Sequence, residues 1–359
     1  MEPFDGLRIN QGRTMKYTNL PNTNLNVSKI CLGTMTFGNQ NTEEEARQQL
    51  DYALDKGVNF IDTAEMYAVP ADPNTQGLTE KYIGSWLSKS GKRDSIVLAS
   101  KVTGPSRGMK HIREALDFNK KSLEDALHKS LARLQTDYLD VYQLHWPERA
   151  VNVFGVREYK HTENELWNDN LAEILERLET FVKEGKVRHI GLSNETPFGV
   201  MRYMEAFRKG SKKMVSVQNA YNLLQRRDEV GLTEVLQMEN IGYLPYSPLA
   251  FGMLTGKYLY GKKPVNARIT RYPNYSRYSA PNSMKATEAY QLIAQKHGLS
   301  LTELALAFVN QQPFVTSTII GATSLKQLSE NIGSIEVTLS EEILEEIQKV
   351  HEQIPNPAP

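Results

Sequence analysis

The stretch Val58-Asn59-Phe60-Ile61-Asp62-Thr63-Ala64-Glu65-Met66-Tyr67 decides the fold. Its first residues favour a buried β-strand, and the Asp62 carboxylate and Tyr67 phenol mark a polar loop after that strand. In an α/β barrel this loop lies at the carboxyl end of the strands, where such barrels carry their chemistry. Taken alone, the pair is explained at least as well by a helix cap and a packing aromatic, so its meaning depends on the rest of the chain.

Short apolar runs alternate with amphipathic stretches along most of the chain. Strictly alternating strands and helices imply parallel strands with right-handed crossovers, and eight such units close a (β/α)8 TIM barrel. An open doubly wound sheet is the competing α/β fold, and it usually has fewer strands. The eight units pair strands at 30–34, 58–62, 96–101, 138–145, 187–193, 215–219, 243–247 and 316–321 with helices at 42–56, 79–88, 119–134, 171–184, 197–208, 230–239, 301–311 and 324–332.

The two ends of the chain add smaller elements to the predicted barrel. Strand-like runs at 16–20 and 27–31 flank a Pro-Asn turn, which predicts an N-terminal hairpin that could plug the bottom of the barrel. We expect extra helices in the last third and a C-terminal helix over 341–352. Residues 1–14 show neither helical nor strand periodicity, so we expect a disordered extension followed by a single barrel domain over 15–359.

Composition favours a cytoplasmic protein with a small-molecule partner. The 42 basic and 42 acidic residues balance, which gives no electrostatic reason to expect a nucleic acid or membrane partner. The single cysteine, Cys31, excludes an intramolecular disulfide and fits a reducing compartment. No run is long and apolar enough for a membrane span, and the histidines show no metal-ligand spacing. Neither the oligomeric state nor the substrate follows from these features.

Titratable residues stand at the ends of three successive predicted strands. Asp62 and Tyr67 follow the second, Lys101 ends the third and His145 ends the fourth. Each alone has a structural explanation, but a barrel would bring all four together at one mouth. A buried lysine needs a counter-ion, which Asp62 can supply, and a lysine cation favours the phenolate and lowers a tyrosine pKa from about 10. We therefore expect Tyr67 to donate a proton near neutral pH.

These motifs resemble the aldo-keto reductase superfamily, whose members are (β/α)8 barrels. The likeness covers nine-tenths of the chain, and phrases such as Gly33-Thr34-Met35-Thr36-Phe37-Gly38 are most similar to the bacterial Tas-like branch. The resemblance implies reduction of aldehydes or ketones, with hydride from a nicotinamide and a proton from Tyr67. It implies that Lys101 tunes Tyr67, Asp62 holds Lys101 and His145 orients the carbonyl.

Later strands carry groups suited to a nicotinamide cofactor. Ser193 and Asn194 end the fifth strand and Gln218 the sixth, so hydroxyl and amide groups gather where a carboxamide could be held. Each could instead cap the following helix. The resemblance implies that these three bind the nicotinamide amide and that Tyr246 stacks on its ring, which suits a flat aromatic face.

The remaining cofactor residues follow the seventh and eighth strands. The chain has neither a GxGxxG fingerprint nor a Walker spacing, so a Rossmann or P-loop site is not expected. A glycine-rich loop and a helix N-terminus are instead suited to phosphates, and the resemblance implies NADPH/NADP+ rather than NADH. The predicted residues are Ser247, Leu249, Gly252, Lys257, Arg268, Gly321, Thr323, Ser324, Gln327, Glu330 and Asn331.

Two other functions remain open. The first is an NADPH-binding redox sensor or regulatory subunit with little turnover, similar to the potassium-channel β subunits that share this barrel. The second is a glycoside hydrolase using Asp62 and Glu65, although such pairs usually come from different strands. Three long connections at 103–118, 147–170 and 250–281 should wall the pocket. Met35, Trp146 and Trp167 are candidates for its lining, although core packing explains Trp146 and Met35 at least as well.

Overall fold

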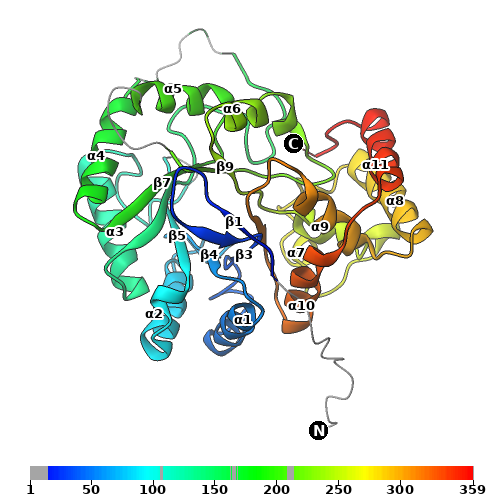
Figure 1. Ribbon diagram of the computed structural model, residues 1–359, viewed down its shortest axis with the longest axis horizontal. Helices are drawn as coiled ribbons and strands as arrows, with labels where there is room; N and C mark the ends of the chain where they lie inside the picture. Colours follow the sequence, from blue (N-terminus) through cyan, green and yellow to red (C-terminus); the bar gives the residue numbers. More distant parts are fainter. Residues whose placement is uncertain are drawn as a thin grey trace.

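Eight parallel strands of the described chain form one curled sheet around which the helices are arranged (Figure 1). The computed structural model describes residues 15–105, 108–161, 163, 167, 169–207 and 214–358. In sheet order the strands are β10 (Thr318–Ile320), β3 (Ile30–Gly33), β4 (Phe60–Asp62), β5 (Val97–Val102), β6 (Leu139–Leu144), β7 (Val187–Ser193), β8 (Ser216–Gln218) and β9 (Gly242–Tyr243). Parallel bridges from Tyr243 to Val315 and from Tyr246 to Ile319 join the two edges. The predicted (β/α)8 barrel is therefore confirmed.

Each of the eight strands is followed by a helix on the outside of the barrel. The helices are α1 (Glu43–Asp55), α2 (Leu78–Ser90), α3 (Lys120–Leu134), α4 (Leu171–Lys183), α5 (Pro197–Phe207), α6 (Leu232–Met238), α9 (Leu301–Gln311) and α10 (Leu325–Gly333). Sequence signals explain their starts: Thr42 and Glu45 form the expected capping box of α1, and Ser300 and Glu303 form another on α9. Short 3₁₀ helices lie at Arg93–Ser95, Arg227–Val230, Ala250–Thr255, Leu259–Gly261 and Ser334–Glu336.

Several strands are shorter than the apolar runs that predict them. The clearest case is β9, expected over 243–247 but formed only by Gly242–Tyr243. Pro245 has no N–H to donate, so the ladder cannot continue regularly. The backbone still reaches its neighbour, because the Tyr246 N–H donates to the Asn219 carbonyl at 2.9 Å. Tyr246 is thereby held at the end of the barrel strands.

The predicted N-terminal hairpin closes the bottom of the barrel. Strands β1 (Tyr17–Asn19) and β2 (Asn26–Ser28) pair antiparallel and lie across the ring of strands in Figure 1. The side chains of Leu20 and Val27 are fully buried and pack with Cys31 and Phe60 from the barrel interior. Cys31 is thus a core residue, enclosed between the sheet and the hairpin. Residues 1–14, the predicted extension, lie outside the described residues.

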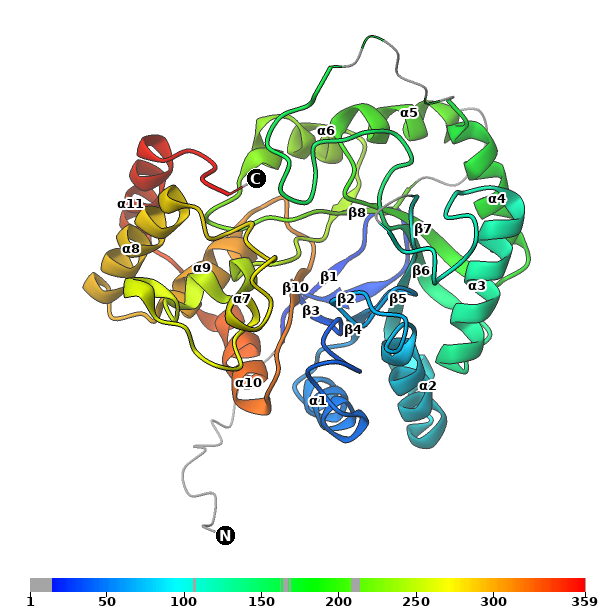
Figure 2. The ribbon, with the colours of Figure 1, turned by 180° about the vertical axis from the view of Figure 1, so that it is seen from behind.

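Helices beyond the eight units gather on one side of the barrel. They are α7 (Arg268–Arg271), α8 (Pro281–Lys296) and α11 (Glu341–Gln353), and Figures 1 and 2 both show α8 and α11 together beside α9. Extra helices in the last third and at the C-terminus were expected. The sequence does not predict the bounds of α8, because its buried face includes Ser283, Ala286 and Thr287, which do not form an obvious apolar stripe.

Candidate active site

A cavity of about 1070 Å³ opens at the carboxyl ends of the barrel strands. Most of the predicted site residues line it, although they come from positions as far apart as Asp62 and Asn331. These are Asp62, Tyr67, His145, Ser193, Asn194, Gln218, Tyr246, Ser247, Leu249, Gly252, Lys257, Arg268, Gly321, Thr323, Gln327, Glu330 and Asn331. Lys101 is fully buried beneath the floor, and Ser324 is the N-cap of α10 and does not line the cavity.

A buried ion pair lies under Tyr67 at the floor of the cavity. The Lys101 ammonium donates to the Asp62 carboxylate at 2.6 Å and to the Thr63 carbonyl at 2.8 Å. Its third contact is the Tyr67 hydroxyl oxygen, at 3.4 Å. Asp62 ends β4 and Lys101 lies within β5, so pairing of these adjacent strands brings the two charges together. The lysine thus couples the carboxylate to the phenol.

Two amide side chains complete the surroundings of Asp62. Gln143 and Gln218 both donate from Nε2 to Asp62 Oδ1, at 3.2 and 2.8 Å, so each carboxylate oxygen has a donor. Gln218 Nε2 also donates to Gln143 Oε1 at 3.2 Å. Gln218 therefore has a structural bond to the ion pair as well as a place in the cavity wall.

The pKa of Tyr67 in this cluster differs from the sequence-based expectation. Burial by itself lowers the pKa of Lys101, but the Asp62 carboxylate and the Tyr67 oxygen together turn the net shift upward. Burial is also the largest influence on Tyr67 and raises its pKa above the ordinary value; Lys101 lowers it, and Asp62 raises it. The expected fall of the Tyr67 pKa is therefore wrong for this structure, because burial outweighs the lysine. Tyr67 holds its proton at neutral pH.

His145 faces the phenol from the end of β6. Its ring lies edge-on to Tyr67 with centroids 5.9 Å apart, and it packs on Trp146 at 4.9 Å. Asn194 donates to the His145 carbonyl at 2.8 Å and so fixes the backbone behind the ring. A substrate oxygen between Tyr67 and His145 could contact both side chains.

The groups predicted to hold a nicotinamide form a connected set beside this cluster. Ser193 Oγ donates to the Gln218 carbonyl at 2.8 Å, and Asn194 Nδ2 donates to Ser193 Oγ at 3.1 Å. The Tyr246 hydroxyl donates to Asn194 Oδ1 at 2.7 Å. Asn194 has a φ of 54°, a left-handed conformation that asparagine adopts more readily than most residues. The structure thus brings all four residues to one wall.

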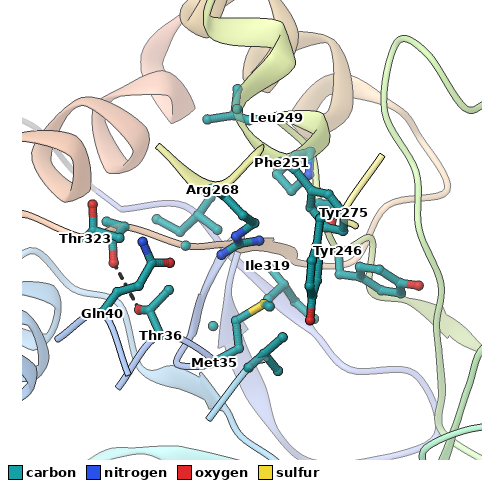
Figure 3. A pocket seen from close by; sticks show the side chains of 18 of the residues that line it. Met35, Thr36, Gln40, Tyr246, Leu249, Phe251, Arg268, Tyr275, Ile319 and Thr323 are labelled. Carbon is teal, nitrogen blue, oxygen red and sulfur yellow. Dashed lines mark hydrogen bonds between the residues drawn. The ribbon is translucent and has the colours of Figure 1, made fainter. Parts of the chain in front are cut away.

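Two cations face another part of the cavity without a carboxylate partner among the described residues. Arg268 reaches across the middle of the cavity in Figure 3, between Thr323 and Gln40 on one side and Tyr246 and Tyr275 on the other. Burial lowers the pKa of Arg268, and burial followed by repulsion from Arg268 lowers the pKa of Lys257. Such unneutralised cations favour an anionic ligand.

The segment from β10 into α10 forms the adjoining wall. Thr36 donates to the Ala322 carbonyl at 3.3 Å, the bond drawn in Figure 3, and Asn331 donates to the Gly321 carbonyl at 3.1 Å. The Gln327 side chain accepts from the Thr323 N–H at 3.0 Å. Ser324 accepts from the Gln327 N–H at 3.3 Å and is thus the N-cap of α10.

Sequence reasoning missed two buried ion pairs that fasten the long loops. Glu65 binds Arg113 through one oxygen and the Thr103 N–H through the other, so the β4–α2 segment is tied to the β5–α3 loop. Arg149 in the β6–α4 loop donates to both carboxylate oxygens of Glu195, which lies just after β7. Each pair joins residues more than 40 positions apart, so no local pattern indicates it. Glu65 does not line the cavity, which disfavours the hydrolase pairing with Asp62.

The three long connections supply part of the cavity wall as expected. Met109 comes from the first, Phe154 and Gly155 from the second, and a larger group from the third. Met35 and Trp146 line the cavity, whereas Trp167 packs against the core and does not.

Sequence comparison now identifies the family. The family model described as "Aldo/keto reductase family" matches residues 29–352. The chain belongs to the aldo/keto reductase family. An aldo/keto reductase is an oxidoreductase, and members of the family generally use nicotinamide cofactors. The predicted likeness to the Tas-like branch is confirmed by Protein tas of Escherichia coli (strain K12), 51% identical over 352 residues, or 96% of this chain and 100% of that protein.

More distant relatives carry related names. The uncharacterized oxidoreductase YrpG of Bacillus subtilis (strain 168) is 33% identical over 336 residues, covering 92% of this aldo/keto reductase and 94% of YrpG. Norsolorinic acid reductase B of Dothistroma septosporum is 27% identical over 352 residues, covering 94% and 82% of the two chains.

Two features of this aldo/keto reductase lie away from the cavity. None of the described helices combines the length and apolarity needed to cross a bilayer. His297, directly after α8, lies close enough to Glu342 and Glu346 of α11 to share an ion with them. Sequence spacing could not show this group, because it spans two helices. Lys296 already pairs with both glutamates, so a salt bridge accounts for the cluster.

Proposed function

We propose that the chain reduces aldehydes or ketones to alcohols with NADPH as the cofactor. The observation that carries this proposal is the Asp62–Lys101 ion pair beneath Tyr67, at the floor of a cavity with cationic walls. The family assignment makes the chain an oxidoreductase, and the site supports this specific reaction.

Tyr67 acts as the proton donor in this proposal. Its raised pKa keeps the hydroxyl protonated, and Lys101 stabilises the phenolate that forms when the proton moves to the carbonyl oxygen. Asp62 balances the lysine charge and acts through it, without touching substrate. His145 lies beside Tyr67 and orients the carbonyl oxygen toward the phenol.

The cavity suits a dinucleotide phosphate. Bound there, the nicotinamide would supply the hydride that reduces the carbonyl carbon. Ser193, Asn194 and Gln218 would hold its carboxamide, and the Tyr246 face would support the ring. Gln218 Nε2 donates to Asp62 and to Gln143, so the Gln218 Oε1 can accept a carboxamide N–H.

Lys257, Arg268 and the start of α10 favour a phosphorylated ribose and so NADPH over NADH. A 2′-phosphate would neutralise cations that are otherwise buried without a counter-ion among the described residues. Gly252 has a φ of 88° and lies against Lys257, so the backbone can approach a pyrophosphate closely. We assign Ser247, Leu249, Gly321, Thr323, Gln327, Glu330 and Asn331 to the same site, with Ser324 acting through the α10 cap.

Steady-state assays with NADPH and a panel of aldehydes and ketones test the proposal. Tyr67→Phe should lower kcat by about a hundredfold or more, because it removes the donated proton, while NADPH affinity stays within about twofold. Tyr138→Phe is the matched control: it removes a phenol bonded to Asp94 at the opposite end of the barrel and should leave kcat unchanged. Equal turnover by wild type and Tyr67→Phe would show that Tyr67 is not the donor.

Fluorescence titration with NADPH and NADH separates the alternatives. If the chain is the proposed reductase, it binds NADPH more tightly than NADH and consumes NADPH when a carbonyl substrate is added. Tight NADPH binding without turnover would instead support the sensor or regulatory subunit. Absence of NADPH binding would overturn both.

A further inference from the structure

One arginine of the cavity has no part in the proposed reaction. Arg277 lies in the long connection after β9 and lines the cavity. Its guanidinium lies 5.6 Å from the ring centre of Phe154 and 5.8 Å from those of Phe251 and Tyr278. It also interacts with the hydroxyl groups of Tyr246 and Tyr278. In the described part of the chain, no carboxylate forms an ion pair with it.

Arg277 and Arg268 have different neighbours within the cavity. Both lie near Phe251, Arg268 at 5.2 Å and Arg277 at 5.8 Å from its ring centre. Arg268 lies in the middle of the cavity between Thr323 and Tyr275, as Figure 3 shows. Its charge also acts on Lys257 and Tyr67. Arg277 instead contacts Phe154 and Tyr246, which come from the β6–α4 loop and the end of the barrel strands.

The neighbours of Arg277 lead to the reacting groups. Phe154 packs edge-on against Trp146 with centroids 5.8 Å apart, and Trp146 packs on His145 at 4.9 Å. His145 is in turn beside Tyr67. Arg277 therefore lies along the aromatic wall that leads to the proposed proton donor.

The charges around the cavity leave Arg277 available for an anion. The acidic residues lining the described cavity are Asp62 and Glu330. Asp62 is held by Lys101, and Glu330 belongs to α10, in the proposed cofactor wall. Aromatic rings beside a guanidinium exclude water and strengthen its hydrogen bonds to a carboxylate.

We propose that Arg277 binds the carboxylate of the substrate, so that the preferred substrates are aldehydes or ketones that carry a carboxylate group. This inference rests on the proposed carbonyl reduction: the substrate carbonyl lies at Tyr67 and His145 while its carboxylate lies at Arg277. A planar guanidinium can hold a carboxylate through two parallel hydrogen bonds, which a lysine cannot reproduce.

Matched acid and ester substrates test this role in the full-length chain. The pairs are succinic semialdehyde and 4-formylbenzoate, each with its neutral methyl ester. In wild type, kcat/KM should be at least about tenfold higher for one acid than for its ester, mainly through KM. Arg277→Met should abolish that preference while changing the ester kcat/KM and the NADPH Kd less than about threefold. Arg277→Lys should retain part of the preference because it keeps the charge.

A control separates substrate binding from ordering of the loop. Arg271 is an exposed arginine of the same connection, stacked on Tyr272 and absent from the cavity wall. Arg271→Met should leave the acid preference intact. If wild type shows no acid preference, or if Arg277→Met lowers acid and ester turnover equally, Arg277 only supports the loop and the proposal is wrong.

A binding measurement distinguishes failure of this inference from failure of the proposed reaction. Calorimetry with the NADP⁺-saturated chain compares 4-(hydroxymethyl)benzoate with its methyl ester. Tighter binding of the acid by wild type and not by Arg277→Met supports the anion site even if no aldehyde is reduced. Equal binding of acid and ester by wild type overturns the anion site even if aldehydes are reduced.

Discussion

A proton donor must hold its proton at the working pH and release it when charge develops on the substrate. Burial gives Tyr67 the first property by raising its pKa, and Lys101 provides the second by stabilising the phenolate. Asp62 has the opposite effect on Tyr67 from that of Lys101, since its negative charge raises the pKa of the phenol. Asp62 and Lys101 therefore determine, together with the burial of Tyr67 itself, the pKa of the proton donor.

The pH dependence of reduction follows from the raised pKa of Tyr67. Activity needs the protonated phenol, so kcat/KM should stay level between about pH 6 and 9 and fall only above about pH 10. Lys101→Met removes the group that lowers this pKa, so any residual activity should fall at still higher pH. Initial rates across the pH range measure both profiles. An alkaline fall centred below pH 8 in wild type would contradict the burial argument.

At the scale of whole elements, the active site depends on loops that are fastened by buried charges. Glu65 lies two residues before Tyr67, and both of its oxygens are bound by the β5–α3 loop, through Thr103 and Arg113. Gln76 donates to the Glu65 carbonyl at 2.7 Å from the other side. The position of the proton donor and the shape of the cavity wall are thereby linked.

Breaking this link should cost both stability and substrate binding. Glu65→Gln leaves Arg113 buried without its counter-ion, so we expect a loss of about 3–5 kcal/mol in unfolding free energy and a raised KM. The double variant Glu65→Gln with Arg113→Met should recover part of the stability but not the KM, since the loop stays unfastened. Denaturant unfolding and steady-state kinetics measure the two effects. A double variant less stable than Glu65→Gln would refute the buried-charge explanation.

Local sequence patterns predicted the features that depend on residues close together in the chain. Eight strand and helix pairs, the α1 capping box and the residues at strand ends all follow from periodicity or from a motif. Arg277 and the Glu65–Arg113 pair could not be found in this way, because their partners come from other loops. The pKa of Tyr67 was expected in the wrong direction because a sequence shows the neighbouring lysine but not the depth of burial.

At the scale of the whole molecule, the ring of strands closes irregularly between β9 and β10. β9 and β10 are joined by isolated bridges rather than by a continuous ladder, and the longest connection leaves the barrel at this seam. Tyr246 stands on one side of the seam and Gly321 on the other, and both line the cavity. The chain thus places its proposed cofactor wall where the sheet is least regular, which leaves room for a long ligand over the mouth.

Because Cys31 is enclosed within the barrel, the rate at which it reacts with a thiol reagent measures how often the barrel opens. This sole thiol is fully buried inside the barrel behind the hairpin, and burial raises its pKa well above the ordinary value. A thiol reagent should therefore react with the folded chain about a thousandfold more slowly than with the chain in guanidinium chloride. Because the chain has no second cysteine, a single absorbance trace reports opening of the barrel without a label or an engineered residue. Rapid labelling of the native protein would show that the hairpin opens independently of the rest of the barrel.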